Sequence, residues 1–289
     1  MTTSLEFRGS PTPTVGIELE TTIIDARTRQ PLDYGVDLAS AVTSLIPVGR
    51  ACTEISASCL EISSGIGLTV GQSVQDLVDI HRSMEPTLVE RSMQLLAMGL
   101  HPTITYATSA MNSSPHYEWV KESISWALTD LHTCALHIHV AVPDGDAAVR
   151  ACNALRGHVP ILLAMSASSP LFNGSLTGLA STRASIFTRV PRSGLPPRVE
   201  NWNEYCALLA AFTKADVMRG PLDTWWDIRF QPALGTIEIR ICDAIADVNS
   251  IAGLAALIQC LVAMSLHGPT SSLHEAIAMQ NRWLATRDG

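Results

Sequence analysis

The sequence predicts an α+β fold built on an antiparallel sheet. Strand-like and helix-like segments follow one another irregularly, and a short turn joins the strand-like segments 226–230 and 236–243. This order favours an antiparallel sheet over a doubly wound parallel one. Three segments, 16–20, 136–140 and 237–241, alternate an ionisable residue with an aliphatic one. Because successive side chains of a strand point to opposite faces, each segment is predicted to bury one face and line the other with charge or imidazole.

The remaining elements are predicted from apolar periodicity and from helix signals. Apolar residues at helical spacing predict a helix over 70–100, which Pro86 kinks or divides. Asp144 is a good N-cap for a helix over 146–165, with Pro160 as a break. The other predicted elements are strands over 15–24 and 58–64, helices over 119–132 and 202–214, and a final apolar helix from about Val248.

The composition is that of a well-packed globular protein. Hydrophobic residues make up 47% of the 289 residues and charged residues 16%, so a sizeable core is expected and disorder is not. The net charge of −8 argues against a nucleic-acid or anionic-membrane surface as a partner. We expect one catalytic domain over residues 14–289, preceded by a flexible N-terminus over residues 1–13.

The expected location is the cytoplasm. The seven cysteines are odd in number and form no CxxC pair, which is typical of reduced thiols in the core. Residues 1–13 contain no apolar signal core. The longest apolar stretch, 251–266, falls short of the roughly 20 residues that a membrane span needs, so we expect a buried helix there.

Ionisable side chains on the predicted strands are the candidate functional residues. If the strands share one sheet, these side chains converge on a single polar surface. Taken singly, each segment is equally compatible with an amphipathic strand that carries cross-strand salt bridges. Taken together, so many charges on strand faces need a reason, because burying them unpaired is costly. The candidates are Glu18, Glu20, Glu61, His137, His139, Arg229, Glu238 and Arg240.

This mixture of side chains points to a metal-dependent reaction on an anion. Ligands that are mostly carboxylate oxygens suit Mg²⁺ or Mn²⁺, whereas a structural zinc site would need closely spaced cysteine and histidine. Arginines beside the metal suit a phosphoryl group in transfer. The chain has no GxxxxGKS/T, GxGxxG or GxSxG motif, so a P-loop, a Rossmann nucleotide site and a hydrolase elbow are not supported.

The same segments resemble the carboxylate–amine ligases of the glutamate–cysteine ligase type 2 family. The order and approximate spacing of the matching motifs agree from residue 15 to the C-terminus. The motifs are Gly16-Ile17-Glu18-Leu19-Glu20, Cys59-Leu60-Glu61-Ile62-Ser63, Met98-Gly99-Leu100-His101-Pro102, His137-Ile138-His139-Val140, Ala164-Met165-Ser166-Ala167-Ser168-Ser169-Pro170, Thr177-Gly178-Leu179-Ala180-Ser181-Thr182-Arg183, Trp226-Asp227-Ile228-Arg229, Thr236-Ile237-Glu238-Ile239-Arg240-Ile241-Cys242-Asp243 and Asn281-Arg282-Trp283.

The resemblance implies a glutamine-synthetase-like catalytic domain, in which helices pack on one face of a curved antiparallel sheet and the concave face binds nucleotide and metal. It implies that a carboxylate is activated with ATP and Mg²⁺ (or Mn²⁺) as an acyl phosphate and passed to an amine, with a γ-glutamyl amide as the narrower expectation. Carried over by motif, the metal ligands are Glu18, Glu20, Glu61, His139 and Glu238, the nucleotide contacts are His137, His139, Arg183 and Arg229, and the catalytic residues are Arg183, Glu238 and Arg240.

Two alternatives keep part of this interpretation. The first is a phosphotransferase of the guanidino-kinase type, a group that has a related catalytic sheet. The second is a catalytically silent relative that binds nucleotide or metal. The chain also ends soon after Asn281-Arg282-Trp283, where relatives continue with more helix, so we expect a C-terminally short catalytic domain. The expected partners are a small-molecule carboxylate and an amine, and the apolar C-terminal helices suggest a homodimer.

Overall fold

The centre of the fold is one antiparallel sheet, as predicted. The computed structural model describes residues 5–105, 109–267 and 273–289. The strand order is β10-β11-β5-β1-β3-β2, with β4 paired to the far part of β1. Every pairing in this sheet is antiparallel. The strands are β1 (Val15–Asp25), β2 (Arg50–Thr53), β3 (Cys59–Ser63), β4 (Met93–Leu96), β5 (Leu136–Ala141), β10 (Ile228–Gln231) and β11 (Thr236–Ile239).

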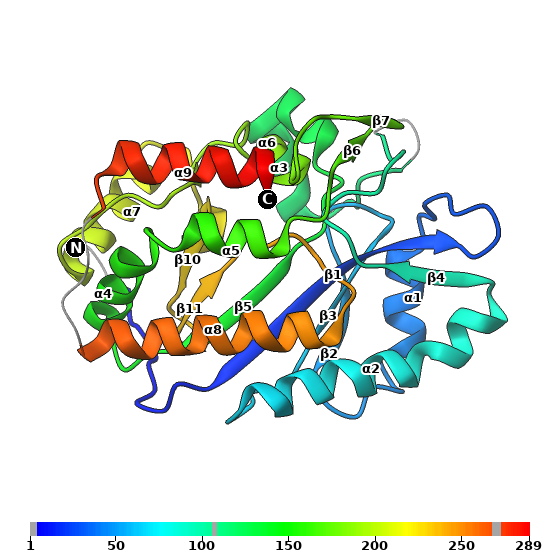
Figure 1. Cartoon of the computed structure of the whole chain (residues 1–289), viewed down its shortest axis with the longest axis horizontal. Helices are drawn as coiled ribbons and strands as arrows, with labels where there is room; N and C mark the ends of the chain where they lie inside the picture. The colour runs from blue at the N-terminus through cyan, green and yellow to red at the C-terminus, as the bar shows by residue number, and fades with distance from the viewer. Residues whose placement is uncertain (1–4, 106–108, 268–272) are drawn as a thin grey trace.

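The long helices cover one face of this sheet (Figure 1). Helices α1, α2, α4 and α8 contact its strands, and α5 packs against α9. Short strands pair outside the sheet, β6 (Leu171–Phe172) with β7 (Ser175–Leu176) and β8 (Ser193–Gly194) with β9 (Trp225–Trp226). The helices are α1 (Gly35–Val42), α2 (Val70–Glu90), α3 (Pro115–Ile124), η1 (Ser125–Asp130), α4 (Gly145–Leu155), α5 (Val159–Ser166), α6 (Thr182–Phe187), α7 (Trp202–Lys214), η2 (Pro221–Asp223), α8 (Val248–His267) and α9 (Glu275–Asp288).

The aliphatic residues of the alternating strands form the main core. Ile17, Ile138 and Ile239 are at most 1% exposed and lie in one apolar cluster with residues of the covering helices. A second apolar cluster lies around α3 and α6, and its buried members are Leu100, Ile104, Val120, Ile124, Leu128, Leu131, Ile186 and Val190. Period-two alternation therefore separates an apolar face, which packs against helices, from a charged face.

The predicted helix over 70–100 is too long. Helix α2 ends at Glu90, and residues 93–96 form β4, which pairs with β1. Ser92, with φ of 52°, turns the chain between the two elements. Pro86 does not divide the helix but lies within α2. The helix predicted over 119–132 begins earlier, at Pro115, and gives way to the 3₁₀ helix η1.

The first described residues contact the end of the sheet. Arg8 N donates to the Pro232 carbonyl, and Ser10 N donates to the Val142 carbonyl, each at 2.9 Å. The Phe7 ring meets the Trp202 ring edge-on at 5.2 Å between centroids. The flexible N-terminus over 1–13 and the single domain over 14–289 stay predictions, and residues 1–4 lie outside the described part of the chain.

Helix α8 is the predicted apolar helix, but it buries only one stripe. Its buried residues are Ile251, Leu254, Ala255, Ile258, Val262 and Ser265. Among the described residues, it is the one helix whose length and apolar composition would suffice to cross a membrane. Such a helix also occurs at the core of soluble proteins, so this is weak evidence for a span. Exposed apolar side chains on α8 and α9 include Met264, Met279 and Trp283, and the homodimer stays a prediction.

A buried ion pair fastens α9 to the sheet. Arg282 Nε donates to Asp227 Oδ2 at 2.7 Å, and Arg282 Nη2 donates to Asp227 Oδ1 at 2.9 Å. Both residues are buried, Arg282 at 8% and Asp227 at 5% exposure. Two of the motifs noted in the sequence, Asn281-Arg282-Trp283 and Trp226-Asp227-Ile228-Arg229, therefore meet through this pair.

We expect Arg282→Leu to lower the free energy of unfolding by about 3–5 kcal/mol, because it leaves the Asp227 carboxylate buried without its partner. Urea unfolding followed by circular dichroism measures this loss. The control is Arg287→Leu on the same helix, whose exposed side chain pairs with Asp288 and should contribute little to stability because water screens the pair. Equal effects of the two substitutions would contradict a structural role for the buried pair.

Candidate active site

The register of the sheet brings the predicted residues together. Glu18 lies opposite His137 in the β1–β5 pairing, and Glu238 lies opposite His139 in the β5–β11 pairing. On the other side of β1, Glu20 lies opposite Glu61 of β3. These residues, with Arg229 and Arg240, make up the charged face of the sheet, which is opposite the face covered by helices.

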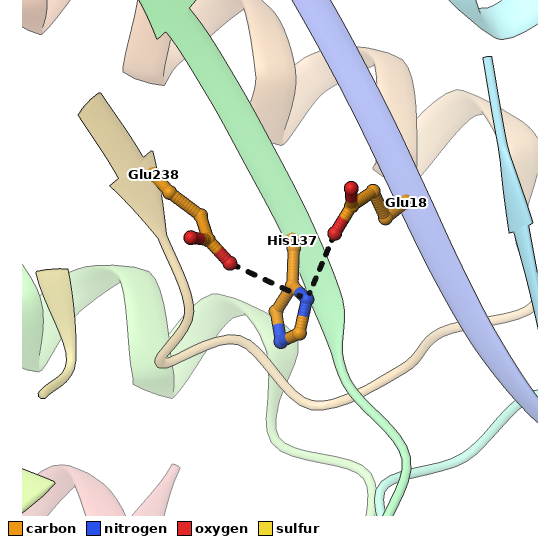
Figure 2. Close-up of side chains that lie close together, drawn as sticks. All are labelled: Glu18, His137 and Glu238. Atoms are coloured by element: carbon orange, nitrogen blue, oxygen red, sulfur yellow. Dashed lines mark hydrogen bonds and ion pairs between the residues drawn. The ribbon is translucent and has the colours of Figure 1, made fainter. Parts of the chain in front are cut away.

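His137 is at the centre of the charged face (Figure 2). Its Nδ1 lies 3.3 Å from Glu18 Oε2 and 3.7 Å from Glu238 Oε1. Its Nε2 lies 3.9 Å from Glu20 Oε1. Figure 2 shows the side chains of three neighbouring strands turned toward one another around this imidazole. His139 adds a second contact, with Nε2 at 3.4 Å from Glu18 Oε1.

The Glu238 carboxylate is fully buried and held by cations. Arg229 donates to it twice, Nε to Oε2 at 2.7 Å and Nη2 to Oε1 at 3.0 Å. Arg240 Nη1 also donates to Oε1, and Gln231 Nε2 donates to Oε2 at 2.7 Å. Burial opposes its charge, but Arg229 and Arg240 outweigh this and hold the pKa of Glu238 well below its ordinary value.

Two overlapping groups of side chains have the geometry of a cation site. Ligand atoms of Glu18, His137 and Glu238 lie within 4.8 Å of one another, and so do those of Glu20, Glu61 and His137. The Nε2 atom of His137 is buried and has no hydrogen-bond partner, and the buried Nε2 of His139 has only the 3.4 Å contact with Glu18. Buried imidazole nitrogens are normally paired, so these two atoms fit a ligand such as a divalent cation.

The neighbouring charges separate the pKa values of the acidic residues. Burial opposes ionisation of Glu18, yet hydrogen bonds from His137 and His139 hold its pKa well below the ordinary value. Burial and the nearby Cys134 and Glu61 raise the pKa of Glu20 to about 8. Without a bound cation, Glu18 is therefore charged at neutral pH while Glu20 is mostly protonated.

The two histidines also differ. Burial and the charge of Arg240 lower the pKa of His137 to about 4, so this imidazole is neutral at physiological pH. Burial also opposes the charge of His139, but Glu238 and Glu18 outweigh it and raise the His139 pKa. A neutral imidazole can act as a metal ligand, whereas a protonated one would have to lose its proton first.

Arg183 lines the cavity but its guanidinium is largely engaged with the protein. Its Nη1 donates to the Ile241 carbonyl and its Nη2 to the Arg240 carbonyl, both at 3.0 Å. Asp243 lies 3.5 Å from Nη1. Only Nε is buried without a partner. The contacts seen here fix the backbone of Arg240, and a direct catalytic role of Arg183 stays a prediction.

Asp243 explains why several of the sequence motifs are needed. Its carboxylate accepts hydrogen bonds from Ser168 N, Ser169 Oγ and Ser181 Oγ at 3.0, 2.7 and 2.9 Å. A side chain at Gly99 could not fit, because its Cβ would lie 2.5 Å from Asp243 Cγ. These motif residues therefore build the support of the charged face and do not belong to it.

Sequence analysis missed three residues of this site. Arg50 lies in β2 and Glu54 directly follows that strand. Both residues line the cavity, as does Gln231 of β10. Arg50 Nη2 lies 3.2 Å from Glu61 and 3.7 Å from Glu18. Burial, Glu61 and Glu20 raise the pKa of Glu54 well above its ordinary value. The segment 50–54 has no regular alternation, so periodicity could not identify it.

A cavity of about 890 Å³ lies over the charged face. One end, which we call the turn end, is at the β10–β11 turn and is lined by Leu5, Arg8, Pro232, Ala233 and Leu234. The other end, the apolar end, is lined mainly by Ile55, Tyr117, Val120, Ile124, Leu131, Phe187, Val190 and Trp225. The charged face lies between them and contributes Glu18, Glu20, Glu61, His137, His139, Arg229 and Arg240 to the lining.

The sequence matches one protein family over nearly its whole length. The model of the glutamate-cysteine ligase family 2 matches residues 14–289. The protein named "Putative glutamate–cysteine ligase 2-3" of Rubrobacter xylanophilus is 39% identical over 285 residues, which cover 98% of this chain and 77% of that protein. The corresponding protein of Gloeobacter violaceus is 33% identical over 99% of this chain and 78% of its own length.

Solved structures share the fold at much lower sequence identity. A glutamate–cysteine ligase from Francisella tularensis, solved in complex with AMP, has a TM-score of 0.67 at 11% identity and covers 97% of this chain and 71% of that one. A bifunctional glutathione synthetase from Pasteurella multocida also has a TM-score of 0.67, at 13% identity over 95% of this chain and 41% of that one. These two likenesses confirm the predicted glutamine-synthetase-like fold class.

We expect the metal-free protein to lose stability as pH rises from about 5 to 8. The pKa of Glu20 is about 8 in the folded chain against an ordinary 4.5, so the folded state holds a proton that the unfolded state has lost. Stability then falls with pH across this window. Urea unfolding in a chelator at several pH values measures the slope.

Glu20→Gln should flatten this slope, because its amide stays neutral at every pH in the window. Glu90→Gln, at an exposed position on α2, is the matched control and should leave the slope as it is. An unchanged slope in Glu20→Gln would show that this carboxyl is not the protonated group.

Proposed function

The chain belongs to the glutamate-cysteine ligase family 2, which makes it an ATP-dependent carbon–nitrogen ligase, and we propose that it forms an amide through an acyl phosphate with Mg²⁺. In this reaction a carboxylate oxygen attacks the γ-phosphorus of ATP, and ADP leaves. The nitrogen of an amine then attacks the acyl carbon, phosphate leaves, and the amine loses a proton. The observation that carries the proposal is the charged face, where carboxylates, imidazoles and arginines meet inside one cavity.

The charged face suits Mg²⁺ or Mn²⁺. Glu18, His137 and Glu238 would hold one cation, and Glu20, Glu61 and His137 offer a second, overlapping site. The buried Nε2 atom of His137, which has no hydrogen-bond partner and lies 3.9 Å from Glu20, supports this assignment. A divalent cation at this place would offset the repulsion between the polyphosphate and the carboxylate that attacks it.

Two arginines favour binding of the polyphosphate near the turn end. Arg229 lies on the charged face, Arg8 lines the turn end, and the exposed Arg8 side chain pairs only with the nearby Glu6 among the described residues. Arginine is well suited to phosphate recognition because its planar guanidinium presents several donors at once. We therefore place the polyphosphate over His139 and Arg229, with the nucleotide extending toward the turn end.

Arg240 is placed to act on the phosphoryl group in transfer. Its Nη1 contacts Glu238, and its Nε is buried without a partner. Burial opposes its charge, but Glu238 and Glu20 outweigh burial and raise the pKa of Arg240, so its charge is retained. Arg183 would act on the reaction chiefly by holding the Arg240 carbonyl, at 3.0 Å from Nη2. A fixed positive charge at the reacting phosphorus stabilises the charge that develops there.

The substrates are a small carboxylic acid and a small amine. The matched relatives are named for glutamate and cysteine, so a γ-glutamyl amide is the first product to test. A coupled assay of ADP release measures the reaction with each acid and amine alone and together. A ligase needs both, a guanidino-kinase-like phosphotransferase needs one acceptor, and a silent relative releases no ADP with any mixture.

We expect Glu238→Gln to reduce Mg²⁺-dependent ADP release by at least about 100-fold, because it removes the charge that both a cation and the arginines need. Removal of that charge also leaves Arg229 and Arg240 uncompensated, so thermal unfolding must confirm that the variant is folded. Turnover close to that of the unaltered protein would remove Glu238 from the cation site.

Glu18→Gln is the cleaner companion variant, since Glu18 is not bound to the two arginines. It should weaken binding of Mn²⁺, measured by electron paramagnetic resonance of the free ion, as well as reduce ADP release. Glu122→Gln, an exposed residue of α3, is the matched control and should change neither quantity. Unaltered Mn²⁺ affinity in Glu18→Gln would contradict the proposed cation site.

A further inference from the structure

The apolar end of the cavity is chemically different from the rest of the site. Val120, Ile124, Leu131 and Val190 are all less than 9% exposed and belong to the second apolar cluster, yet they line this end. Phe187 and Trp225 pack against the same cluster and also line the cavity. A wall of aliphatic and aromatic side chains therefore continues directly from the charged face.

The sheet register shows that this wall is at the opposite end from the turn. Leu131 shortly precedes β5, whereas the β10–β11 turn lies beside the last residue of β5, because Ala141 pairs with Thr236. Ile55 shortly precedes β3, whose Cys59 pairs with Thr22, beyond Glu20 along β1. The apolar end thus begins where the row of carboxylates ends.

A triphosphate fits the apolar end poorly. Acidic side chains border it, Glu54 with Glu20 and Glu61 beside it, and the arginine that contacts Glu61, Arg50, is paired with that carboxylate at 3.2 Å. Arg183 lines the cavity next to Phe187, and two of its three nitrogens are bound to backbone carbonyls. This end therefore offers a polyphosphate acidic side chains and a largely engaged guanidinium, not the free positive charge that phosphate groups favour.

Two aromatic side chains of the wall stack against arginine guanidinium groups. The Arg183 guanidinium lies over the Phe187 ring at 5.3 Å, and the Arg192 guanidinium lies over the Trp225 ring at 5.1 Å. Such stacking restricts the ring rotamers before a ligand binds, so binding loses less side-chain conformational entropy. The apolar end is therefore a preformed surface and resembles the apolar part of a small-molecule site.

We propose that the apolar end binds an aryl or branched alkyl group carried by the small substrate of the reaction. This inference rests on the proposed function, because it places the reacting carboxyl or amino group over Glu20 and Glu54 and its apolar substituent against Val120, Phe187 and Trp225. Glutamate, whose far end carries two charges, would find little to pair with on this wall. The substrate class is thus a hydrophobic acid or a hydrophobic amine.

Binding of simple probes to the full chain tests this without requiring turnover. Isothermal titration in the presence of ADP and Mg²⁺ compares phenylacetate and 4-methylpentanoate with acetate and L-glutamate. A parallel series compares benzylamine and isobutylamine with ethanolamine. We expect at least about tenfold tighter binding of the apolar members of one series, since hydrophobic pockets discriminate by such factors. The series that shows the gain identifies the substrate that carries the apolar group.

Val120→Phe should abolish this gain, because the added ring occupies the space against which the probe would pack. The matched control is Val89→Phe, the same change at a position on α2 that is 70% exposed, and it should keep the gain. Phe187→Leu is a second variant that fills no space, and it should weaken phenylacetate relative to 4-methylpentanoate by removing an aromatic contact.

The inference is overturned if neither series prefers its apolar members, or if Val120→Phe leaves the preference as it was. Loss of ADP binding in Val120→Phe, with probe binding unchanged, would show that the nucleotide base occupies this end and would also overturn it. The proposed function fails separately, if no acid–amine mixture releases ADP while the apolar probes still bind and Val120→Phe still removes their binding.

Discussion

The buried charge of Glu238 is the constraint around which the charged face is arranged. A carboxylate without exposure to water is stable only if cations and donors surround it, and Arg229, Arg240 and Gln231 provide them. Arg229 and Gln231 lie on β10, and Arg240 lies just after β11. The order of strands at this edge of the sheet therefore also determines where the site lies.

A second buried carboxylate, that of Asp243, holds together the segments that support the charged face. Three serine donors from two loops converge on it, and Arg183 lies beside it. The two serine segments are also joined directly, because Ser169 N donates to the Ala180 carbonyl at 3.1 Å and Thr182 N donates to the Ser169 carbonyl at 2.9 Å. Arg183 joins both centres, because it contacts Asp243 on one side and the backbone of Arg240 on the other.

Sequence predicted best where alternation is regular and long. The segments around Glu18, His137 and Glu238 alternate strictly, so their shared face and mutual proximity followed from strand geometry alone. It failed where long-range pairing outweighs local preference, as in residues 93–96, which continue a helical pattern but pair with β1. Glu54 and Arg50 were missed because β2 is short and irregular, and the roles of Asp243 and Arg282 depend on partners that no local pattern reveals.

The contrast between the two ends of the cavity also has a basis in the sheet. Strands run the length of the cavity, so side chains at one end come from turns and those at the other from loops and short helices that follow no strand pattern. The polar chemistry is fixed by the strands, whereas the apolar wall is formed by α3, α6 and β9. Substitutions in the wall can alter which molecule is accepted without disturbing the residues that react.

The attachment of α9 has a consequence for biosynthesis. Arg282 binds Asp227, and the carbonyls of Thr286 and Arg287 accept hydrogen bonds from the backbone N–H groups of Ser181 and Ala180. Ser181 is one of the serines that bind Asp243. A growing polypeptide therefore lacks these contacts, which support the charged face, until α9 has emerged from the ribosome.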